Sequence, residues 1–558
     1  MTADTGAAGI VPTREVPSTT HWTSLDARGL GLEESPSLDR ARRAPHPPRV
    51  STEGVLAARV LDALLREDYG GLRSYARDGH LTPPGTAPVK LRADGSAGGL
   101  HPGFLTDAVV DVEQELRLAD VLALAERVAH RQDDVAALVR ECREALTATL
   151  LCESARPEVM RRLADSDPLG PGVFYETLAA HAEHPVYPCS RARSGLTPTD
   201  LRRHAPEFAP EFPLRWARVP RGEITAVGEL PGWWPDPDLF PVHPLAVPDV
   251  RKQADVLPEA FRPARPTLSM RTLAADPLVH VKVPLPTSTL GLRNRRTIVP
   301  GTLPDGALAE RLLRTVLDEE DRPVLLADEQ TYGHAGTPLL AYLVRRFPAG
   351  TERAHVVPVA ALTAPHPDGG LVIERWNVRN LFGQYLDALL GWNVALFERG
   401  IALEAHQQNV ALVLAPGEPL RLLLKDNDGM LVNPDVLGAP CPFGDHRMRT
   451  RDREALARVF VTITLHLCAA APAFALAEHG LLPRAEGLAM IRDRLDALLV
   501  PSAGPEAAFL RARVLDAPTF PTKAMVTAGT LVDKARTGAA DINKHYGPDG
   551  PNYLRNLP

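Results

Sequence analysis

Two acidic residues and two neighbouring polar residues form the most informative chemical pattern in the sequence. Within residues 400–429, Asp426 and Asp428 are spaced two apart, and His406 and Gln408 have the same spacing upstream. Residues two apart on a strand share a face, so each pair would present its polar groups on one side. Two carboxylates beside a carboxamide offer the hard oxygen ligands that Mg²⁺ shares with substrate phosphates. A solvated polar turn and a structural histidine are the alternatives that the pattern leaves open.

A second stretch gathers groups that could bind a polyanion. Ser269, Arg271 and Thr272 put two hydroxyls and a guanidinium within four residues, ahead of an apolar run that contains Lys282. Hydroxyl, guanidinium and ammonium donors are what a triphosphate requires, and arginine adds bidentate geometry. A solvated basic loop is the competing interpretation. Neither a G-x-x-x-x-G-K-[ST] loop nor a G-x-G-x-x-G loop occurs, so a P-loop or Rossmann nucleotide site is not indicated.

The acidic pair needs a scaffold, and the sequence predicts a β-hairpin for it. Two apolar runs, residues 410–414 and 420–424, flank a turn rich in proline and glycine. We expect Leu414 to lie opposite Leu420, and this register brings both polar pairs to one face at the open end of the hairpin. The expected opposite pairs are His406 with Asp428 and Gln408 with Asp426. A slip of one residue would separate them.

Composition and hydrophobic periodicity divide the whole chain into a tail and three expected lobes. Residues 1–50 mix Pro, Ser, Thr and Arg without periodicity and are expected to form a flexible tail. Residues 51–167 have helical periodicity. Residues 168–370 interleave prolines with short β-type runs, namely HVKVPLP, RTIVP, PLLAYLVRRF and HVVPVAAL, so a β-rich lobe is expected. Residues 371–558 combine a helical stripe, the hairpin and further helices. The predicted fold class is therefore α+β, with a helical N-terminal lobe, a β-rich middle lobe and a mixed C-terminal lobe containing an antiparallel sheet.

Net charge, cysteine spacing and the N-terminal sequence limit the classes of partner and the cellular location that we expect. The 558 residues carry a net charge of -7, which gives no footprint for phosphate-backbone binding, so no nucleic acid partner is expected. The five cysteines are scattered and form no C-x-x-C pair, which favours a reducing cytoplasm. The N-terminus has no basic start followed by an apolar run, so no secretory signal is expected. The uncharged stretch Val459–Ala477 is expected to be a buried core helix, and no membrane association is predicted.

The order of several short motifs along the chain resembles a known family. They are EHPVYPCSRARSG at residues 183–195, HPLA at 243–246, S-x-R-T at 269–272, Lys282 followed by T-x-x-x-R at 289–293, E-x-H-x-Q-N at 404–409, Lys-Asp-Asn-Asp at 425–428 and Lys523. In this order they resemble the NRPS-independent siderophore synthetases, the aerobactin-synthetase-like family, over most of the chain from about Val55 to Leu557. S-x-R-T and E-x-H-x-Q-N are together the most specific of these motifs.

The resemblance implies an ATP-dependent ligase with thumb, fingers and palm lobes. Such an enzyme uses ATP and Mg²⁺ to adenylate a carboxylic acid, by default citrate or a related polycarboxylate, and releases pyrophosphate. An amine or hydroxyl nucleophile then displaces AMP, in siderophore or related natural-product biosynthesis. The partners would be the small-molecule acid and nucleophile, and a homodimer is an assembly that the resemblance permits.

The resemblance also implies roles for individual residues. The expected catalytic residues are Arg271, His406 and Arg293. ATP would be bound by Ser269, Arg271, Thr272, Lys282, Gln408, Asn409 and Asp426. The substrates would be bound by His184, Arg193, Thr289, Arg293, His406 and Lys523. Mg²⁺ would be held by Asn409, Asp426 and Asp428.

Some positions depart from the usual motifs of the family. Tyr187 stands where the second histidine of H-P-x-H-P is usual, Glu183 replaces a glycine and Arg191 replaces a lysine. We therefore hypothesise that the chain forms adenylates but accepts an unusual acid or amine. Two alternatives stay open: a phosphotransferase with protein-kinase-like architecture, because H-x-x-N followed by an acidic pair also occurs there, and a non-catalytic relative that binds a nucleotide or metabolite.

Overall fold

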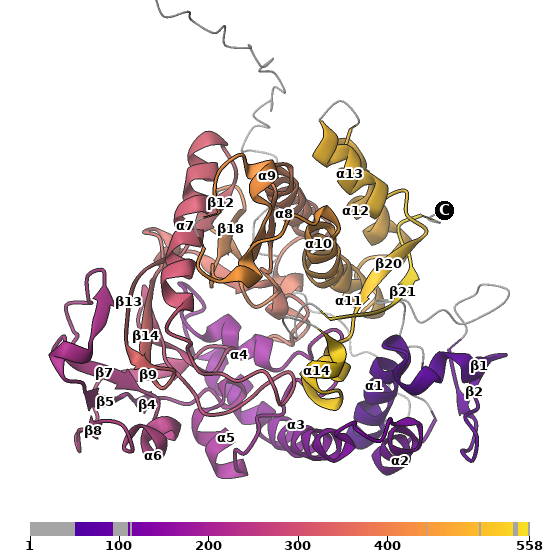
Figure 1. Ribbon diagram of the computed structural model, residues 1–558, viewed down its shortest axis with the longest axis horizontal. Coiled ribbons are helices and arrows are strands. Elements are labelled where there is room, and N and C mark those ends of the chain that lie inside the picture. Colours follow the sequence, from indigo (N-terminus) through magenta and orange to yellow (C-terminus); the bar gives the residue numbers. More distant parts are fainter. Residues whose placement is uncertain are drawn as a thin grey trace, which may run out of the picture.

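The computed structural model describes residues 51–92, 110–111, 114–441, 443–500, 504–538 and 545–555 (Figure 1). The expected tail, residues 1–50, lies outside the described residues. The described chain mixes helices and sheets, as the α+β prediction requires.

The first part of the chain is mainly helical. Helix α1 (Thr52–Arg66) begins at Ser51, whose hydroxyl accepts the backbone N–H of Gly54, a favourable N-cap. The longer helix α3 (Val135–Ala164) begins at Asp134 in the same way. Between them lie a 3₁₀ segment (Tyr69–Tyr75), a small sheet of β1 (Ala76–Arg77), β2 (His80–Leu81) and β3 (Val89–Lys90), and helix α2 (Leu118–Val128). The apolar faces of these helices form one core.

A seven-stranded sheet dominates the middle of the chain. Its order is β4 (Phe212–Pro213), β9 (Pro263–Pro266), β10 (Thr272–Asp276), β11 (Val279–Lys282), β14 (Leu340–Arg346), β13 (Asp328–Thr337) and β6 (Thr225–Val227). A second sheet has the order β7 (Leu239–Val242), β5 (Arg215–Arg218) and β8 (Asp255–Val256). The helices of this part are α4 (Phe174–Ala180), α5 (Pro198–His204), α6 (Val247–Val250) and α7 (Thr302–Glu319). The strands expected in HVKVPLP, PLLAYLVRRF and HVVPVAAL are present.

The strand expected in RTIVP is wrong. Arg296 makes only two backbone hydrogen bonds across to the preceding segment, with Leu285 at 3.0 Å and Thr287 at 2.9 Å, and no strand forms in this described segment. The Arg271 guanidinium donates to the carbonyls of Arg296 and Thr297 at 3.1 and 2.9 Å. The segment therefore runs as an irregular loop that is anchored to Arg271.

The predicted hairpin lies in a four-stranded sheet of order β12 (Val324–Leu326), β18 (Arg421–Leu424), β17 (Val410–Leu414) and β15 (His355–Pro358). β12 and β18 run parallel, whereas the other two pairs are antiparallel. The expected boundary near residue 370 therefore does not separate the sheets, because β12 and β15 come from before it. The lobe boundaries stay a prediction.

The C-terminal part of the chain is mainly helical. The predicted apolar stripe forms α8 (Val378–Glu398), which the left-handed Gly400 follows. The others are α9 (Pro434–Leu437), α10 (Arg453–Val459), α11 (Ala471–Glu478), α12 (Arg484–Leu498), α13 (Pro505–Val514) and α14 (Lys534–Thr537). A π-helical segment, Phe460–Ala470, joins α10 to α11. The resulting helix, Arg453–Glu478, is long and apolar enough to span a membrane, but 89% of its apolar window is buried inside the protein. This agrees with the buried core helix expected at Val459–Ala477.

Two short antiparallel pairs complete the fold. β16 (Ile401–Leu403) pairs with β19 (Met430–Val432), directly beyond the open end of the hairpin. β20 (Thr519–Lys523) pairs with β21 (Tyr546–Pro551) near the C-terminus. The segment after β20 returns to the N-terminal helices, because Val526 and Leu531 belong to the apolar core of α1 and α3. Figure 1 shows these C-terminal elements in yellow beside α1 in indigo.

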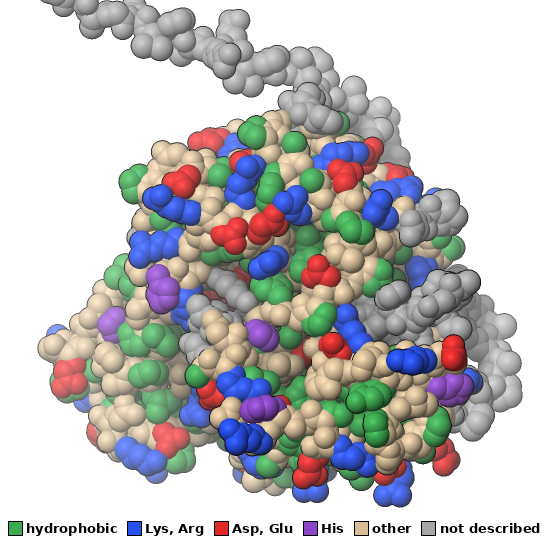
Figure 2. All heavy atoms as spheres, turned by 45° about the vertical axis from the view of Figure 1, so that its right-hand side comes forward, with side chains coloured by type: hydrophobic (Ala, Val, Ile, Leu, Met, Phe, Trp, Pro, Cys, Tyr) green, Lys and Arg blue, Asp and Glu red, His purple; other side chains and the backbone are tan. Residues whose placement is uncertain are grey.

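On the face of the molecule in Figure 2, basic and acidic side chains are interspersed over the described residues. The described part of this face therefore shows no large patch of one charge. Charged side chains of both signs gather instead around one cavity, among them Arg271, Asp426 and Lys523.

Candidate functional site

One cavity of about 360 Å³ collects side chains from distant parts of the chain. Its walls come from α4 and the loop after it, the loop before β10, the loop at residues 289–296, the two segments at the open end of the hairpin, and the residues around Lys523. Ile463 and Leu467 of the buried helix add an apolar patch. The cavity therefore lies where the middle and C-terminal regions of the chain meet.

Most of the residues predicted from the sequence line this cavity. They are His184, Arg193, Ser269, Arg271, Thr289, His406, Gln408, Asn409, Asp426, Asp428 and Lys523. The lining does not include Thr272, Lys282 or Arg293. Lys282 lies behind it and contacts Asp426, whereas the Arg293 guanidinium donates to the carbonyl of Ala528 at 3.3 Å. Direct contact of Arg293 with a substrate therefore stays a prediction.

The S-x-R-T motif forms a tight turn that ends in β10. Met270 has a φ of 64°, in the left-handed region, and the Ser269 hydroxyl accepts the backbone N–H of Thr272 at 3.0 Å. This turn directs Ser269 and Arg271 into the cavity. Burial lowers the pKa of Arg271 from its ordinary value, although the carboxylates of Asp426 and Asp428 partly oppose this.

The hairpin has the predicted register, because Val410 pairs with Leu424. The ladder continues for one more bond, from the Lys425 N–H to the Asn409 carbonyl at 2.9 Å. It then stops, since Asp426 has a φ of 64°. The expectation that His406 faces Asp428 and Gln408 faces Asp426 across a regular ladder is therefore wrong. Residues 406–409 form a turn instead, and all four predicted side chains reach the cavity from these irregular ends.

Asp426 and Asp428, here called the acidic tip, meet a group of cations. Lys282 contacts Asp426 and lies 3.9 Å from Asp428, and Arg345 lies 3.6 Å from Asp426. Burial alone would raise the pKa of Asp426, but Lys282, Arg345 and Arg271 outweigh it and hold that pKa well below its usual range. Desolvation at the cavity, with the neighbouring Asp426 charge, raises the pKa of Asp428, although its side chain is still 43% exposed.

Two buried glutamates that the sequence analysis missed support this arrangement. Glu329 on β13 accepts the backbone N–H groups of Asp426 and Asn427 at 3.0 and 3.1 Å and pairs with Arg345 at 2.5 Å. Glu176 on α4 pairs with Lys425 at 2.6 Å and accepts the backbone N–H of Leu268 at 3.0 Å. Glu176 thereby ties the loop before the S-x-R-T turn to the residue preceding the acidic tip. Both glutamates are distant in the sequence from the residues that they support, so no local sequence pattern predicts their role.

The two histidines in the cavity are neutral hydrogen-bonding groups. Burial lowers the pKa of His406 to about 4 and that of His184 to about 3. The His184 Nδ1 accepts the backbone N–H groups of Val186 and Tyr187 at 3.2 and 2.9 Å, which places the proton on Nε2. His184 can therefore donate one N–H to a bound anion.

The acidic tip has the donor set for Mg²⁺ shared with phosphates. Among the described residues, no group of three or more His, Cys, Asp or Glu side chains could hold a metal ion on its own. Mg²⁺ is commonly bound by one or two carboxylates together with substrate phosphates, and the oxygens of Asp426, Asp428 and Asn409 fit that mode. The cavity thus combines cationic donors with a carboxylate pair suited to a nucleotide with its metal.

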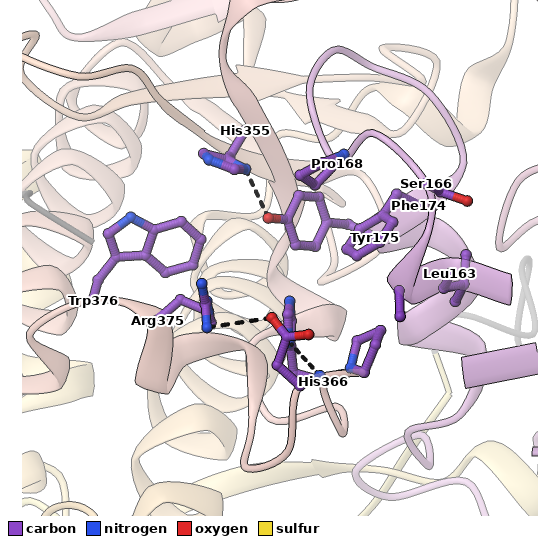
Figure 3. Close-up of a pocket in the computed structure, with 12 residues that line it drawn as sticks. Leu163, Ser166, Pro168, Phe174, Tyr175, His355, His366, Arg375 and Trp376 are labelled. Atoms are coloured by element: carbon purple, nitrogen blue, oxygen red, sulfur yellow. Dashed lines mark hydrogen bonds and ion pairs between the residues drawn. The ribbon is translucent and has the colours of Figure 1, made fainter. Parts of the chain in front are cut away.

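A second, smaller cavity of about 170 Å³ lies on the other side of α4. Figure 3 shows Phe174 and Tyr175 across its opening from Arg375 and Trp376. The Tyr175 hydroxyl is 2.8 Å from the His355 Nδ1. Neighbouring residues of α4 therefore serve two places, because Tyr175 lines this cavity while Glu176 supports the larger one.

Comparisons with known proteins agree with this geometry. A model described as "IucA / IucC family" matches residues 173–230 and 238–364, and one described as "Ferric iron reductase FhuF-like transporter" matches residues 379–538. Residues 173–364 are thus similar to the IucA / IucC family over most of their length. The resemblance to the NRPS-independent siderophore synthetases is thereby confirmed.

Several curated relatives are named as siderophore proteins. The chain is 27% identical over 317 residues to the rhizobactin siderophore biosynthesis protein RhbC of Rhizobium meliloti, covering 46% of this chain and 54% of the relative. It is 25% identical over 338 residues to staphyloferrin B synthase of Staphylococcus aureus, covering 49% and 57%. The chain thus spans about half the length of the curated relatives it matches.

Solved structures share the fold over a larger part of the chain. ATP-bound aerobactin synthetase IucA of Klebsiella pneumoniae superposes with a TM-score of 0.65 at 18% identity, over 90% of this chain and 99% of that one. The petrobactin biosynthesis protein AsbB of Bacillus anthracis gives 0.68 at 18% identity, over 91% and 96%. The mixed helix-and-sheet architecture of the chain is that of these synthetases.

Proposed function

We propose that the chain is an ATP-dependent ligase that adenylates a carboxylic acid and joins it to an amine or hydroxyl nucleophile, releasing AMP and pyrophosphate. One observation carries the proposal. The acidic tip and Arg271 line the same cavity, and Lys282 contacts the tip from directly behind it. A carboxylate that attacks a polyanion requires charge to be neutralised in place, and positioned cations provide this. By analogy with the family, the lobes would correspond to thumb, fingers and palm.

The roles of the side chains follow from where they lie. Ser269, Arg271 and Lys282 would bind the phosphates, with Thr272 holding the turn and Gln408 and Asn409 contacting the nucleotide. Mg²⁺, held by Asn409, Asp426 and Asp428, would supply charge neutralisation on the phosphates. His184, Arg193, Thr289, His406 and Lys523 would bind the acid and its adenylate, with Arg293 supporting that side.

Two bond changes complete the reaction. A carboxylate oxygen of the acid attacks the α-phosphorus of ATP, and the bond to the β-phosphate oxygen breaks to release pyrophosphate. The nucleophile then attacks the carbonyl carbon, its proton passes to water, and the carbon–oxygen bond to AMP breaks. Because the adenylate is already activated, the second step requires mainly orientation, which the neutral histidines and Lys523 would provide.

Citrate or a related polycarboxylate is the default acid. One relative, 27% identical over 315 residues, is named as a citryl-spermidine ligase of Bacillus anthracis, and we bring its acid to this chain as a proposal. We also propose that the protein acts in the cytoplasm, in siderophore or related natural-product biosynthesis, and that it can form a homodimer.

Product analysis across a panel of acids tests the proposal. The protein is incubated with ATP, Mg²⁺ and citrate, 2-oxoglutarate, succinyl compounds or amino acids, and the nucleotide products are separated. Acid-dependent AMP and pyrophosphate support ligation. ADP with a phosphorylated acceptor would show the phosphotransferase alternative, and a lack of turnover with every acid would favour a non-catalytic binder.

A further inference from the structure

A buried carboxylate outside the cavity joins three of its walls. Glu141 on α3 is 2% exposed, and its two oxygens accept three hydrogen bonds. The donors are the Tyr187 hydroxyl at 2.6 Å, the Gly291 backbone N–H at 3.2 Å and the Thr530 hydroxyl at 2.6 Å. These three residues belong to segments that are far apart in the sequence.

Each of the three segments carries side chains into the cavity. The segment of Tyr187 contributes His184, Pro185, Ser190, Arg191 and Arg193. The segment of Gly291 contributes Thr289, Leu290, Asn294 and Arg296. The segment of Thr530 follows Lys523 and Met525. Glu141 does not line the cavity, so it can influence a bound substrate only through these segments.

The contact between the second and third segments is unusually close. Gly291 has a φ of 110°, and a Cβ added there would lie 2.7 Å from the Cα of Gly529. The Arg293 N–H donates to the Gly529 carbonyl at 3.1 Å, and the Leu292 N–H donates to the Thr530 hydroxyl at 3.3 Å. Thr530 therefore accepts from one segment while it donates to Glu141, and the cluster forms one connected hydrogen-bond network.

The surroundings make Glu141 a demanding acceptor. Tyr187 and Thr530 are 0% and 1% exposed, so water does not replace a lost partner easily. Burial raises the pKa of Glu141, and the hydrogen bonds from Thr530, Tyr187 and Gly291 oppose that rise. The three donors stabilise the buried carboxylate, and the carboxylate in turn holds each donor in position.

We propose that Glu141 is a positioning residue that holds the acid-binding side of the cavity together, whereas Glu329 and Glu176 hold the acidic tip and the loop before the S-x-R-T turn. The distinction between acid-binding and phosphate-binding sides rests on the proposed function. The mechanical part, that one carboxylate fixes three segments, rests on the contacts alone.

Hydrogen–deuterium exchange of the full chain tests the mechanical part without any assay of activity. In Glu141→Ala, amide exchange rises at least tenfold in all three segments, residues 183–195, 287–296 and 524–531, and stays unchanged around β10 and the acidic tip. Tyr187→Phe removes one donor, so exchange rises only in residues 183–195. Thr530→Val removes a donor to Glu141 and also the acceptor of the Leu292 N–H, so exchange rises in residues 524–531 and 287–296 but not in 183–195. Unchanged exchange in the three segments of folded Glu141→Ala overturns the proposal, as does a uniform rise across the whole chain.

Kinetics test the functional part once acid-dependent pyrophosphate release by the unaltered protein is established. Glu141→Gln keeps the size of the side chain but replaces one acceptor oxygen with a donor group. We expect the KM for the acid to rise at least tenfold while the Kd for ATP changes less than twofold. Equal changes in both constants, or no change in the KM for the acid, overturn the assignment of Glu141 to the acid side. If the unaltered protein releases no pyrophosphate, the proposed function fails, but the exchange experiment still decides the role of Glu141. Should Glu141→Ala not fold, Glu141→Gln and the two single-donor variants provide the same comparison.

Discussion

Arg271 illustrates how single side chains in this cavity combine structure and chemistry. Its guanidinium lines the cavity and also donates to two carbonyls of the following loop. The fork of the guanidinium makes both tasks possible, whereas an ammonium offers a single centre. A role in phosphate binding follows from the first task, and a contribution to stability follows from the second.

We therefore predict that Arg271→Ala lowers pyrophosphate release at least 100-fold and also lowers the free energy of unfolding by about 2 kcal/mol, since two carbonyls lose a charged donor. Arg271→Lys, the matched control, keeps the charge and should recover part of the activity. Initial rates and thermal melting measure the two effects. Undiminished release in folded Arg271→Ala would remove Arg271 from the reaction.

The acidic tip gives a second prediction at this scale. In Asp426→Asn with Asp428→Asn, two negative oxygen ligands are lost, so the Mg²⁺ concentration for half-maximal rate should rise at least tenfold. A titration of pyrophosphate release with Mg²⁺ measures this. Asp435→Asn, which lies outside the cavity, is the control. A normal rate of the double variant at low Mg²⁺ would exclude the metal assignment.

Single residues also show what sequence can and cannot predict. Residue type and spacing were enough to find Ser269, Arg271 and the acidic tip, because their chemistry is local. The supporting glutamates were missed because their partners are distant: Glu329 lies 97 residues from Asp426, and Glu176 lies 249 residues from Lys425. Only the assembled fold reveals such pairs.

At the scale of elements, the hairpin was predictable because two apolar runs and a proline-rich turn determine its register. The open end of the hairpin was not predictable, because Asp426 adopts a left-handed conformation and ends the ladder at the candidate site. The carboxylate of Glu329 holds that irregular backbone by accepting two of its N–H groups. Irregular backbone at a site is thus stabilised by a buried side chain from another strand.

Helix α4 gives a prediction from two adjacent residues that serve different cavities. Glu176→Gln leaves the buried Lys425 ammonium without its carboxylate, so the free energy of unfolding should fall by about 3 kcal/mol and pyrophosphate release should fall with it. Tyr175→Phe on the same helix removes only the hydrogen bond to His355 and should cost about 1 kcal/mol with little effect on release. Thermal melting and initial rates of both variants measure the difference. Equal effects of the two variants would contradict the support role of Glu176.

The buried helix Arg453–Glu478 predicts how stability depends on pH. His466 in this helix lies within hydrogen-bond distance of the Tyr553 hydroxyl at 2.8 Å and the Pro521 carbonyl at 3.1 Å, and burial lowers its pKa to about 3. Above pH 6.5 the imidazole is neutral in both states and its full contribution to stability is present. As pH falls from 6.5 towards 3, only the unfolded state takes up the proton, so the free energy of unfolding falls by up to about 1.4 kcal/mol per pH unit.

His466→Gln removes this proton uptake, so its melting temperature should depend less steeply on pH between 7 and 5 than that of the unaltered protein. His446→Gln, at a side chain that is 78% exposed, is the control and should leave the dependence unchanged. Melting temperatures across this pH range measure both. An identical slope in His466→Gln and the unaltered protein would refute the burial argument.

At the scale of the whole molecule, chain order and spatial order differ. The sequence texture divides the chain into successive lobes, yet the segment after Lys523 packs against α1 and α3, and Glu67 of the loop after α1 accepts the N–H groups of Val526 and Thr527 at 2.9 and 2.7 Å. Composition and periodicity cannot predict this return, because they describe neighbours along the chain. Lys523 and Met525 line the cavity directly before this return, so its geometry depends on contacts between the two ends of the described chain.

The central claim is that the acidic tip and the cations around it act on one triphosphate to form an acyl-adenylate. Isotope exchange between labelled pyrophosphate and ATP measures that step directly, because it reports reversible adenylation without a nucleophile. We expect exchange that requires both Mg²⁺ and an acid and that is lost in Arg271→Ala and in the double aspartate variant. Exchange that is absent with every acid, or that persists in those folded variants, would contradict it.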